Sequence, residues 1–442
     1  MSMTFSDIKA TIMEEVELAL TERYRASTED TITLEWTLSP FDFHELLSNI
    51  STSNYFYFKN KEGTHEFLGL GEYFAFTSIL DLETIEKWSM ANPRWFFSYT
   101  QHFNPVDTDD VEWSDFAPFK VTLHTITFVR HNDRYSVIVL INNSDSQMSR
   151  KQSLNNIENI LNLVSPGKEV LIAKESVEFP TQEEWKKLID KAKQAMAKGE
   201  FEKVVLARKK ITQYNRSIHA RDLLPVLKNK GENCFNILTR QNPNALFMSM
   251  TPERLFSINN KKIEIDAIAG TRKRGHDKSS DELLAEELLT DSKELYEHRL
   301  VSEQIDRQLK EWARAIKVQR ETILKLKNVQ HLYTKFSAEL KSGINLSTLI
   351  SSLHPTAAIG GYPRAEAVDF IEDNEPFIRG LYASPMGIIQ GPYIDMAVAI
   401  RSSLWKERTC HSFGGAGIVA ESVAIKEWDE TGKKLQSFEV ID

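Results

Sequence analysis

Apolar and polar residues alternate over short stretches in the first part of the chain. Residues 54–59 and 120–128 repeat with a period of two, which is typical of β-strands. Aromatic side chains are dense here, as at residues 55–58. Residues 1–24 instead carry apolar side chains at helical spacing, which predicts an amphipathic helix. We therefore expect a strand-rich N-terminal region, 1–175, packed on the core formed by the rest of the chain.

The region 176–442 alternates between helical and strand patterns. Pro180, Thr181 and Glu184 match a capping box, and the helix that begins there is expected to end at Gly199. A long helix is predicted at 291–316, short helices end at His354 and begin after 360–363, and a final helix carries Glu427 and Glu430. Strands are predicted at 203–208, 233–239, 245–250, 262–268, 380–389, 394–404 and 411–419. Hairpin-like pairs of strands favour an α+β fold with large, mostly antiparallel sheets packed with helices.

Composition narrows the class of protein. A net charge of −9 on 442 residues argues against a nucleic-acid partner. Cys234 and Cys410 are the only cysteines, so a disulfide framework is not expected and a reducing compartment is. The N-terminus does not match a signal peptide, and no apolar run is long enough to span a bilayer. We expect a cytoplasmic protein without a membrane partner.

Two short acidic pairs carry the first candidate chemistry. Glu294 and Glu297 lie three residues apart on one predicted helix, and Glu427 and Glu430 repeat that spacing on another, so each pair shares a helix face. If the two faces converge, the carboxylates need a cation between them, and oxygen ligands suit Mg²⁺. The alternative is two solvated acidic faces, which the pairs alone favour.

Lys203 and Glu253 are candidates for acid–base catalysis. Lys203 enters an apolar strand, and a lysine in a partly dry site can serve as a base. The alternative is a lysine whose ammonium group reaches solvent from the strand end. Glu253 lies in a predicted turn between strands, where a carboxylic acid can protonate a leaving group. Its alternative is a local ion pair with Arg254.

Other residues could bind a carboxylate. Gly270 and Thr271 end a predicted strand with free amides and a hydroxyl, and the glycines at 414–417 let a ligand approach the backbone. Arg401 follows an apolar run and suits a bidentate grip on a carboxylate. His354 is either a hydrogen-bonding wall residue or a core histidine. Together these groups suit a small anionic molecule that bears carboxylates.

Nine segments, taken in order, resemble the chorismate-utilising enzymes, a family that includes isochorismate, salicylate and anthranilate synthases. The resemblance covers about residues 180 to 440 and implies the fold of anthranilate synthase component I. The matching segments are 203–208, 251–255, 268–272 (IAGTR), 294–298, 354–358 (HPTAA), 379–382, 399–401, 413–419 (FGGAGIV) and 427–434.

The resemblance implies a role for each candidate. Lys203 would be the base that activates water for attack at C2 of chorismate, and Glu253 the acid that protonates the departing C4 hydroxyl. Glu297 and Glu430 would coordinate Mg²⁺, and Glu294 and Glu427 would hold its waters. The substrate-binding residues would be Gly270, Thr271, His354, Tyr382, Arg401, Gly415, Gly417 and Lys434.

Two positions discriminate within the family. Aminodeoxychorismate synthases carry a nucleophilic lysine where this chain has Ala269, which leaves water as the nucleophile. The histidine form of residues 354–364 resembles that of isochorismate and salicylate synthases. The chain thus most resembles a menaquinone-type isochorismate synthase that needs no glutaminase partner. The alternatives are a salicylate synthase, which also eliminates pyruvate, and an isochorismate synthase of a siderophore pathway.

Overall fold

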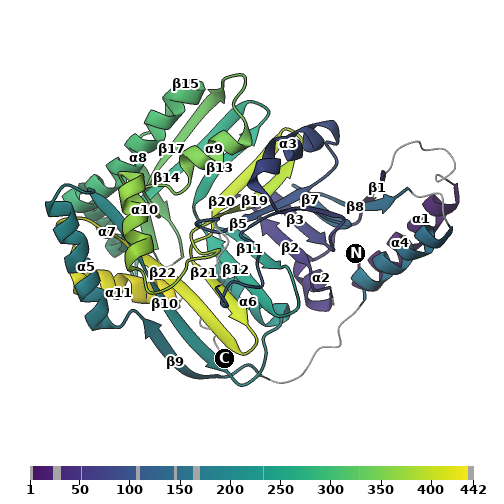
Figure 1. Cartoon of the computed structure of the whole chain (residues 1–442), viewed down its shortest axis with the longest axis horizontal. Helices are drawn as coiled ribbons and strands as arrows, with labels where there is room; N and C mark the ends of the chain where they lie inside the picture. The colour runs from purple at the N-terminus through teal and green to yellow at the C-terminus, as the bar shows by residue number, and fades with distance from the viewer. Residues whose placement is uncertain are drawn as a thin grey trace.

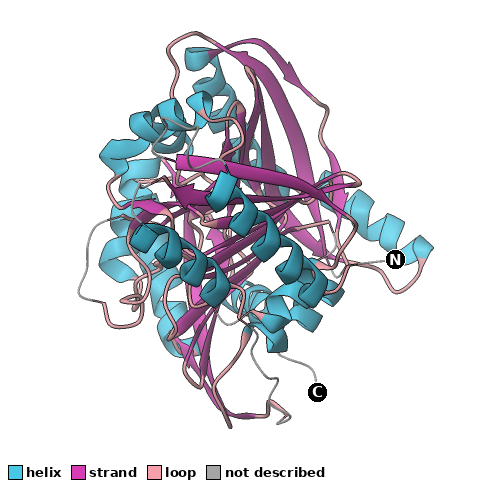
Figure 2. Cartoon of the chain, turned by 90° about the vertical axis from the view of Figure 1, so that its right-hand side faces the viewer, coloured by secondary structure: helices cyan, strands magenta, loops and turns pink. Residues whose placement is uncertain are grey.

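A computed structural model describes residues 3–22, 31–50, 52–105, 110–143, 147–162, 170–231, 233–327 and 329–436. Two large sheets form the centre of the molecule, with helices on the outside (Figures 1 and 2). Among the described residues, every pair of neighbouring strands in both sheets is antiparallel. The predicted α+β class with mostly antiparallel sheets is confirmed.

The first sheet has twelve strands. Its strand order is β1 (Thr31–Leu38), β8 (Arg134–Asn142), β7 (Ile126–His131), β3 (His65–Leu70), β2 (Tyr55–Lys59), β11 (Phe235–Arg240), β12 (Ala245–Thr251), β21 (Ser402–Lys406), β22 (Thr409–Ile418), β10 (Lys203–Tyr214) and β18 (Gly361–Tyr362), with β9 (Ala173–Phe179) also on β10.

The second sheet has ten strands. Its order is β15 (Ala313–Val318), β17 (Val329–Leu340), β14 (Lys262–Lys273), β13 (Arg254–Asn259), β20 (Tyr393–Val398), β19 (Pro385–Gln390), β5 (Phe97–Gln101), β6 (Phe119–Leu123) and β4 (Phe74–Phe76), with β16 (Thr322–Lys325) also on β17.

The described helices cover these sheets. They are α1 (Phe5–Glu22), α2 (Phe43–Asn49), the 3₁₀ turn η1 (Ile79–Asp81), α3 (Leu82–Ala91), α4 (Gln147–Ile160), α5 (Gln182–Ala197), α6 (Ala220–Lys230), α7 (Lys278–Thr290), α8 (Ser292–Trp312), α9 (Leu346–Leu353), α10 (Arg364–Asn374) and α11 (Ala424–Leu435). Helices α1 and α4 lie at one end of the molecule, and α5, α8, α10 and α11 lie at the other (Figure 1). None of the helices in the described ranges is long and apolar enough to cross a membrane.

Strand β2 is buried on both faces. Successive side chains of a strand point to opposite faces of the sheet, and each face of β2 packs against a core. Phe56 and Phe58 point into a core that lies between the two sheets, and Tyr55 and Tyr57 point into a second core under α1, α2 and α6. Strands of the N-terminal third continue both sheets, since β2 pairs with β11 and β5 pairs with β19. The boundary near residue 175 stays a prediction.

Local signals in the sequence fix several elements. Helix α5 begins at the expected capping box, in which Thr181 Oγ1 accepts from the Glu184 amide and the Glu184 carboxylate accepts from the Thr181 amide. The helix expected within residues 1–24 is present as α1, and residues 1, 2, 23 and 24 lie outside the described ranges. Strands β10, β11, β12 and β14 begin within two residues of their predicted starts, and the final helix α11 carries Glu427 and Glu430 as predicted.

Several predicted boundaries are wrong. The strand predicted at 380–389 begins only at Pro385, and β10 and β14 continue to Tyr214 and Lys273. The stretch 120–128 is two strands in different sheets, and it breaks at His124, whose Nδ1 lies 2.8 Å from the carbonyl oxygen of Gly71. The helix predicted at 291–316 ends at Trp312, because Ala313 pairs with Leu340 in the second sheet. The strand predicted at 394–404 breaks at Arg401, which has a φ of 46°.

Candidate active site

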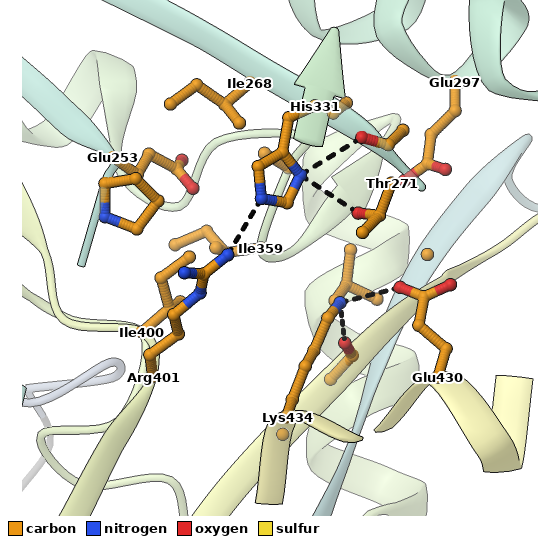
Figure 3. Close-up of a pocket in the computed structure, with 18 of the residues that line it drawn as sticks. Glu253, Ile268, Thr271, Glu297, His331, Ile359, Ile400, Arg401, Glu430 and Lys434 are labelled. Carbon is orange, nitrogen blue, oxygen red and sulfur yellow. Dashed lines mark hydrogen bonds and ion pairs between the residues drawn. The ribbon is translucent and has the colours of Figure 1, made fainter. Parts of the chain in front are cut away.

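A pocket of ≈ 840 Å³ lies where the two sheets meet helices α8 and α11 (Figure 3). Strand β14 and the loop before β13 contribute walls from the second sheet, and β22 contributes a wall from the first. The apolar part of the wall includes Ile268, Ile359, Ile400 and Phe413. The pocket wall therefore combines apolar side chains with charged ones, and Figure 3 shows Glu253 and Arg401 beside the isoleucines.

Most of the sequence-predicted site residues line this one pocket. Lys203 touches it through Glu297, and His354 lies apart from it. The lining residues among the candidates are Glu253, Gly270, Thr271, Glu294, Glu297, Tyr382, Arg401, Gly415, Gly417, Glu427, Glu430 and Lys434.

Helices α8 and α11 bring the two acidic pairs together. The Asp291 side chain caps α8 by accepting from the amides of Lys293 and Glu294, which fixes the first turn. Glu294 Oε2 then accepts from the Thr271 amide at 2.9 Å, and Glu427 is buried in the first turn of α11. Both pairs line the same pocket, and Lys293 lies between them, with Nζ 2.8 Å from Glu427 Oε1 and 3.8 Å from Glu294 Oε1.

Lysines neutralise three of the four carboxylates. The three ion pairs join Lys203 to Glu297 at 2.9 Å, Lys293 to Glu427 at 2.8 Å, and Lys434 to Glu430 at 2.7 Å. Glu294 lacks such a short ion pair, since Lys293 Nζ lies 3.8 Å from its Oε1. Three of the four carboxylates are thus paired with ammonium groups.

The crowding of carboxylates is visible in their acidities. Burial and the neighbouring Glu297 raise the pKa of Glu294 to about 7. Burial also raises the pKa of Glu427. For Glu297, burial alone would raise the pKa, but the adjacent Lys203 outweighs it and holds the pKa below its usual value.

This donor set fits a hard divalent cation. Four carboxylates around one pocket supply the oxygen ligands that Mg²⁺ prefers. Within the described ranges, no three acidic, histidine or cysteine side chains already lie close enough to hold an ion, because lysines hold three of the carboxylates. The raised pKa values of Glu294 and Glu427 mark a site that added positive charge would stabilise.

Lys203 is fully buried at the start of β10. The alternative of an ammonium group that reaches solvent is therefore wrong. Beyond its ion pair with Glu297, Nζ makes no hydrogen bond to any described residue. A buried amine with unused hydrogen-bonding capacity beside a pocket is suited to hold a water molecule or a substrate group.

Glu253 lies between β12 and β13, as the sequence predicts. Arg254 pairs with Glu62 and Asp395, so the alternative of a local ion pair between Glu253 and Arg254 is wrong. Burial raises the pKa of Glu253 to about 7, although Lys203 and a hydrogen bond from Thr356 oppose that shift. A carboxyl group that keeps its proton near neutral pH is suited to general acid catalysis.

Arg401 projects from the break between β20 and β21 with a left-handed backbone. Its Nη2 lies 2.8 Å from Nε2 of His331, whose Nδ1 lies within 3.2 Å of the Gly270 carbonyl oxygen and of the Thr271 hydroxyl oxygen. Burial and the charge of Arg401 hold the pKa of His331 well below its usual value, so this ring is neutral and accepts from Arg401. The chain of contacts aims Arg401 at the wall near Thr271 (Figure 3).

The glycines of β22 leave room for the polar groups opposite them. A Cβ atom on Gly415 would lie 2.7 Å from the Tyr382 hydroxyl oxygen, and one on Gly417 would lie 2.2 Å from Glu297 Oε1. Lys434 Nζ donates to the Gly415 carbonyl oxygen at 2.8 Å, while Tyr382 stacks on Phe413. These positions allow a ligand and the acidic groups to share the space above β22.

His354 is a core residue in this structure. Its Nε2 lies 3.0 Å from the Phe103 carbonyl oxygen, and its ring packs edge-on against the Phe103 ring. Burial lowers the pKa of His354 to about 4, so the ring is neutral at ordinary pH. This geometry matches the second of the two interpretations that the sequence left open.

Among the titratable residues that line the pocket, sequence reasoning missed His331 and Lys293. The signal for Lys293 was present, because it precedes Glu294 and lies four residues before Glu297 on the same helix. His331 carried no such signal. It faces the site because β17 pairs with β14 and sets His331 opposite Thr271.

Comparison with known proteins defines the class. The sequence model described as "Chorismate binding enzyme" matches residues 18–440. The chain therefore belongs to the chorismate-binding enzyme family, as its motifs indicate.

Its relatives narrow the resemblance. It is 31% identical over 257 residues to isochorismate synthase MenF of Pasteurella multocida, covering 57% of this chain and 60% of that protein. It is 27% identical over 428 residues to isochorismate synthase MenF of Bacillus subtilis, covering 90% of each. The solved structure of MenF, the menaquinone-specific isochorismate synthase from Escherichia coli, matches with a TM-score of 0.86 at 24% identity, covering 97% of this chain and 99% of that one. The last likeness establishes the fold.

Proposed function

We propose that this protein is an isochorismate synthase, which converts chorismate to isochorismate with Mg²⁺ and serves menaquinone biosynthesis. One observation carries the proposal: a single pocket joins a buried lysine, a carboxyl group with a pKa of about 7 and four further carboxylates. The printed names of the relatives from Pasteurella multocida and Bacillus subtilis agree with it. A cytoplasmic location and the absence of a glutaminase partner belong to the same proposal.

Lys203 and Glu253 perform the acid–base chemistry. Lys203 is a cation in its resting ion pair with Glu297, and it becomes a base once it has lost that proton to solvent. The neutral amine then takes a proton from a water molecule as its oxygen attacks C2 of chorismate. The ring double bonds shift, and the C4 hydroxyl departs as water with a proton from Glu253. Figure 3 shows Glu253 and Glu297, the partner of Lys203, on different sides of the pocket, in keeping with attack and departure at opposite faces of the ring.

Glu297 and Glu430 would hold Mg²⁺ directly, and Glu294 and Glu427 would hold its waters. When bound, the ion neutralises a carboxylate of the substrate and orients it. Tyr382, Arg401, Lys434 and the backbone near Gly415 and Gly417 would hold the substrate's carboxylates. Gly270 and Thr271 would lie beside its ring. This set of roles also assigns catalysis to the region 176–442.

Charge balance supports the pairing of a divalent cation with a dicarboxylate. The four carboxylates of the acidic pairs face four cationic side chains, which are Lys203, Lys293, Arg401 and Lys434. With Glu253 protonated, these charges cancel. A divalent cation then supplies two positive charges, and the two carboxylates of chorismate balance them.

The test is turnover of chorismate by the purified protein, with products separated by chromatography. We expect isochorismate in the presence of Mg²⁺ and none after chelation. Fluorescent salicylate with equimolar pyruvate would replace the proposal by a salicylate synthase, and the absence of any turnover of chorismate would refute it.

The variant Lys203→Ala tests the role of the base. Turnover should be abolished while chorismate binding stays measurable by calorimetry. Lys209→Ala is the matched control, because Lys209 is a buried lysine of the same strand that pairs with Glu112 and does not line the pocket. Wild-type rates for Lys203→Ala would contradict the assignment.

A further inference from the structure

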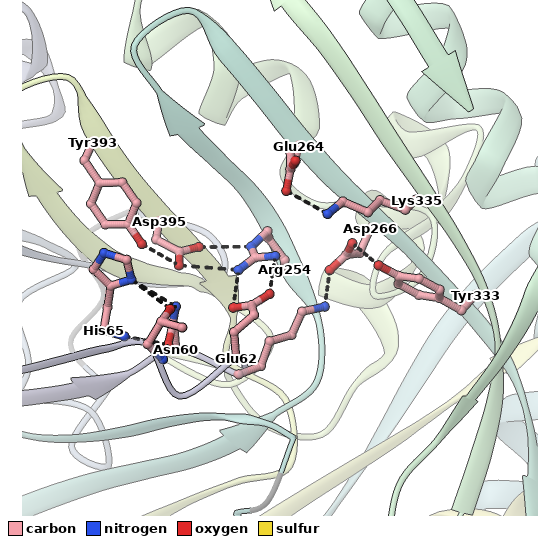
Figure 4. Close-up of polar contacts among 12 residues, drawn as sticks. Asn60, Glu62, His65, Arg254, Glu264, Asp266, Tyr333, Lys335, Tyr393 and Asp395 are labelled. Carbon is pink, nitrogen blue, oxygen red and sulfur yellow. Dashed lines mark hydrogen bonds and ion pairs between the residues drawn. The ribbon is translucent and has the colours of Figure 1, made fainter. Parts of the chain in front are cut away.

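The turn between β2 and β3 reaches from the first sheet into the second. Two consecutive charged residues at its tip, Lys61 and Glu62, pair with Asp266 on β14 and Arg254 on β13. Figure 4 shows Glu62 between the hairpin and Arg254. The N-terminal third therefore makes charged contacts with the strands that form the pocket.

The turn itself is held by its own hydrogen bonds. Asn60 Oδ1 accepts from the amides of Thr64 at 2.9 Å and His65 at 3.0 Å, and Gly63 takes a left-handed backbone with a φ of 68°. These contacts fix the direction in which Lys61 and Glu62 project. The turn thus holds both side chains in place to contact the second sheet.

Its partners are buried and shared with other strands. Arg254 donates to both oxygens of Glu62 at 2.9 and 2.8 Å, and its Nε donates to Asp395 on β20 at 3.1 Å. Asp266 accepts from Lys61 and, at 2.8 Å, from the Tyr333 hydroxyl on β17. The side chains of Asp266, Asp395 and Arg254 are at most 5% exposed, whereas Glu62 is 43% exposed, so Asp395 and Glu62 rather than water balance the charge of Arg254.

The two segments that pair with the turn, at Arg254 and Asp266, lead directly into the proposed active site. Arg254 follows Glu253 in the chain, and Asp266 lies two residues before Ile268, where the wall formed by residues 268–271 begins. Other contacts also hold the Glu253 loop: its carbonyl oxygen accepts from the Val398 amide at 3.0 Å, its amide donates to Thr251 Oγ1 at 3.2 Å, and its carboxyl group accepts from Thr356. The bidentate pair with Glu62 adds a side-chain link from Arg254 to the β2–β3 turn, beside the covalent link of this loop to β12.

We propose that Glu62, through Arg254, is a positioning residue for Glu253, and that the β2–β3 turn is the part of the N-terminal third that supports catalysis. The inference rests on the proposed function of Glu253 as the acid. Glu62 does not touch the pocket, so its removal should slow the chemical step and leave substrate affinity unchanged.

The test compares Glu62→Gln with Glu264→Gln. Glu264 is a matched control because it also forms a cross-strand ion pair, with Lys335, on the strand that carries Asp266, but it touches neither Lys61 nor Arg254. Two measurements are made on the full chain: kcat and KM for isochorismate formation, and hydrogen exchange of the backbone amides of residues 251–256.

For Glu62→Gln we expect kcat to fall about tenfold with KM within about twofold, since a small misplacement of a catalytic group costs rate rather than affinity. Exchange of residues 251–256 should be faster than in wild type, and Glu62→Asp should recover part of kcat. Glu264→Gln should match wild type in both measurements. Unchanged exchange, or faster exchange with wild-type kcat, would overturn the inference. If wild type forms no isochorismate, the proposed function fails, and the exchange comparison alone decides whether Glu62 holds the loop.

Discussion

Replacement of Gly417 by alanine should disable the site without unfolding the protein. The added Cβ would lie 2.2 Å from Glu297 Oε1 and 3.0 Å from Lys203 Cε, whereas ordinary contacts begin at 3.4 Å. The Glu297 carboxylate must therefore move by about 1 Å, and Lys203 must yield with it. A misplacement of this size can lower kcat about a hundredfold.

The same numbers explain why the fold should survive. The clashing atom is the end of a flexible side chain, and Gly417 does not have a left-handed backbone. The stability of the fold should thus change little, and the effect of the substitution should appear in catalysis and in Mg²⁺ binding. We would measure kcat for isochorismate formation, the thermal midpoint, and Mg²⁺ affinity by calorimetry, which should weaken with the displacement of Glu297.

Gly432→Ala is the matched control. Gly432 lies in α11 between Glu430 and Lys434, and a Cβ there meets no described atom within 4 Å. This variant should keep its activity and gain about 1 kcal/mol of stability, because alanine is the better helix former. If Gly417→Ala folds and retains kcat within about threefold of wild type, positioning of Glu297 and Lys203 does not limit the rate.

Three further predictions follow from the site and its frame. Burial raises the pKa of Glu253 to about 7, so its carboxyl group carries a proton below that pH and loses it above. A pH profile of kcat should therefore fall about tenfold per pH unit on the alkaline side, and Glu253→Gln should be inactive. Glu430→Gln should abolish Mg²⁺-dependent turnover while Glu427→Gln reduces it less, as seen in Mg²⁺ titrations; equal losses would contradict the division between direct and water-mediated ligands. Thr181→Ala should cost about 1 kcal/mol in a chemical unfolding experiment and leave kcat unchanged, since it removes only the cap of α5.

Local chemistry made much of this fold predictable. The cap at Thr181 and the carboxylates spaced three apart are signals within one element, and both appear where the sequence indicates. An apolar strand and a turn made Lys203 and Glu253 candidates, and the resemblance to the family implied their roles.

Long-range pairing made the rest unpredictable. His331 reaches the site only through the register that sets it opposite Thr271, sixty residues earlier in the chain. The boundary at His124 has the same origin, because strands β6 and β7 read as one alternating run until each joins a different sheet. Periodicity predicts which face of a sheet a side chain lies on, but it does not predict which strand pairs with it.

The pairing of β2 with β11 and of β5 with β19 bears on how this protein can be divided. A cut near residue 175 would leave two bare edges in the middle of two sheets, with the apolar side chains of β11 and β19 beside them. An isolated C-terminal part would present two templates for intermolecular strand addition. The N-terminal third can thus diverge in its outer helices and loops, while its strands β2 and β5 have to co-evolve with the catalytic part.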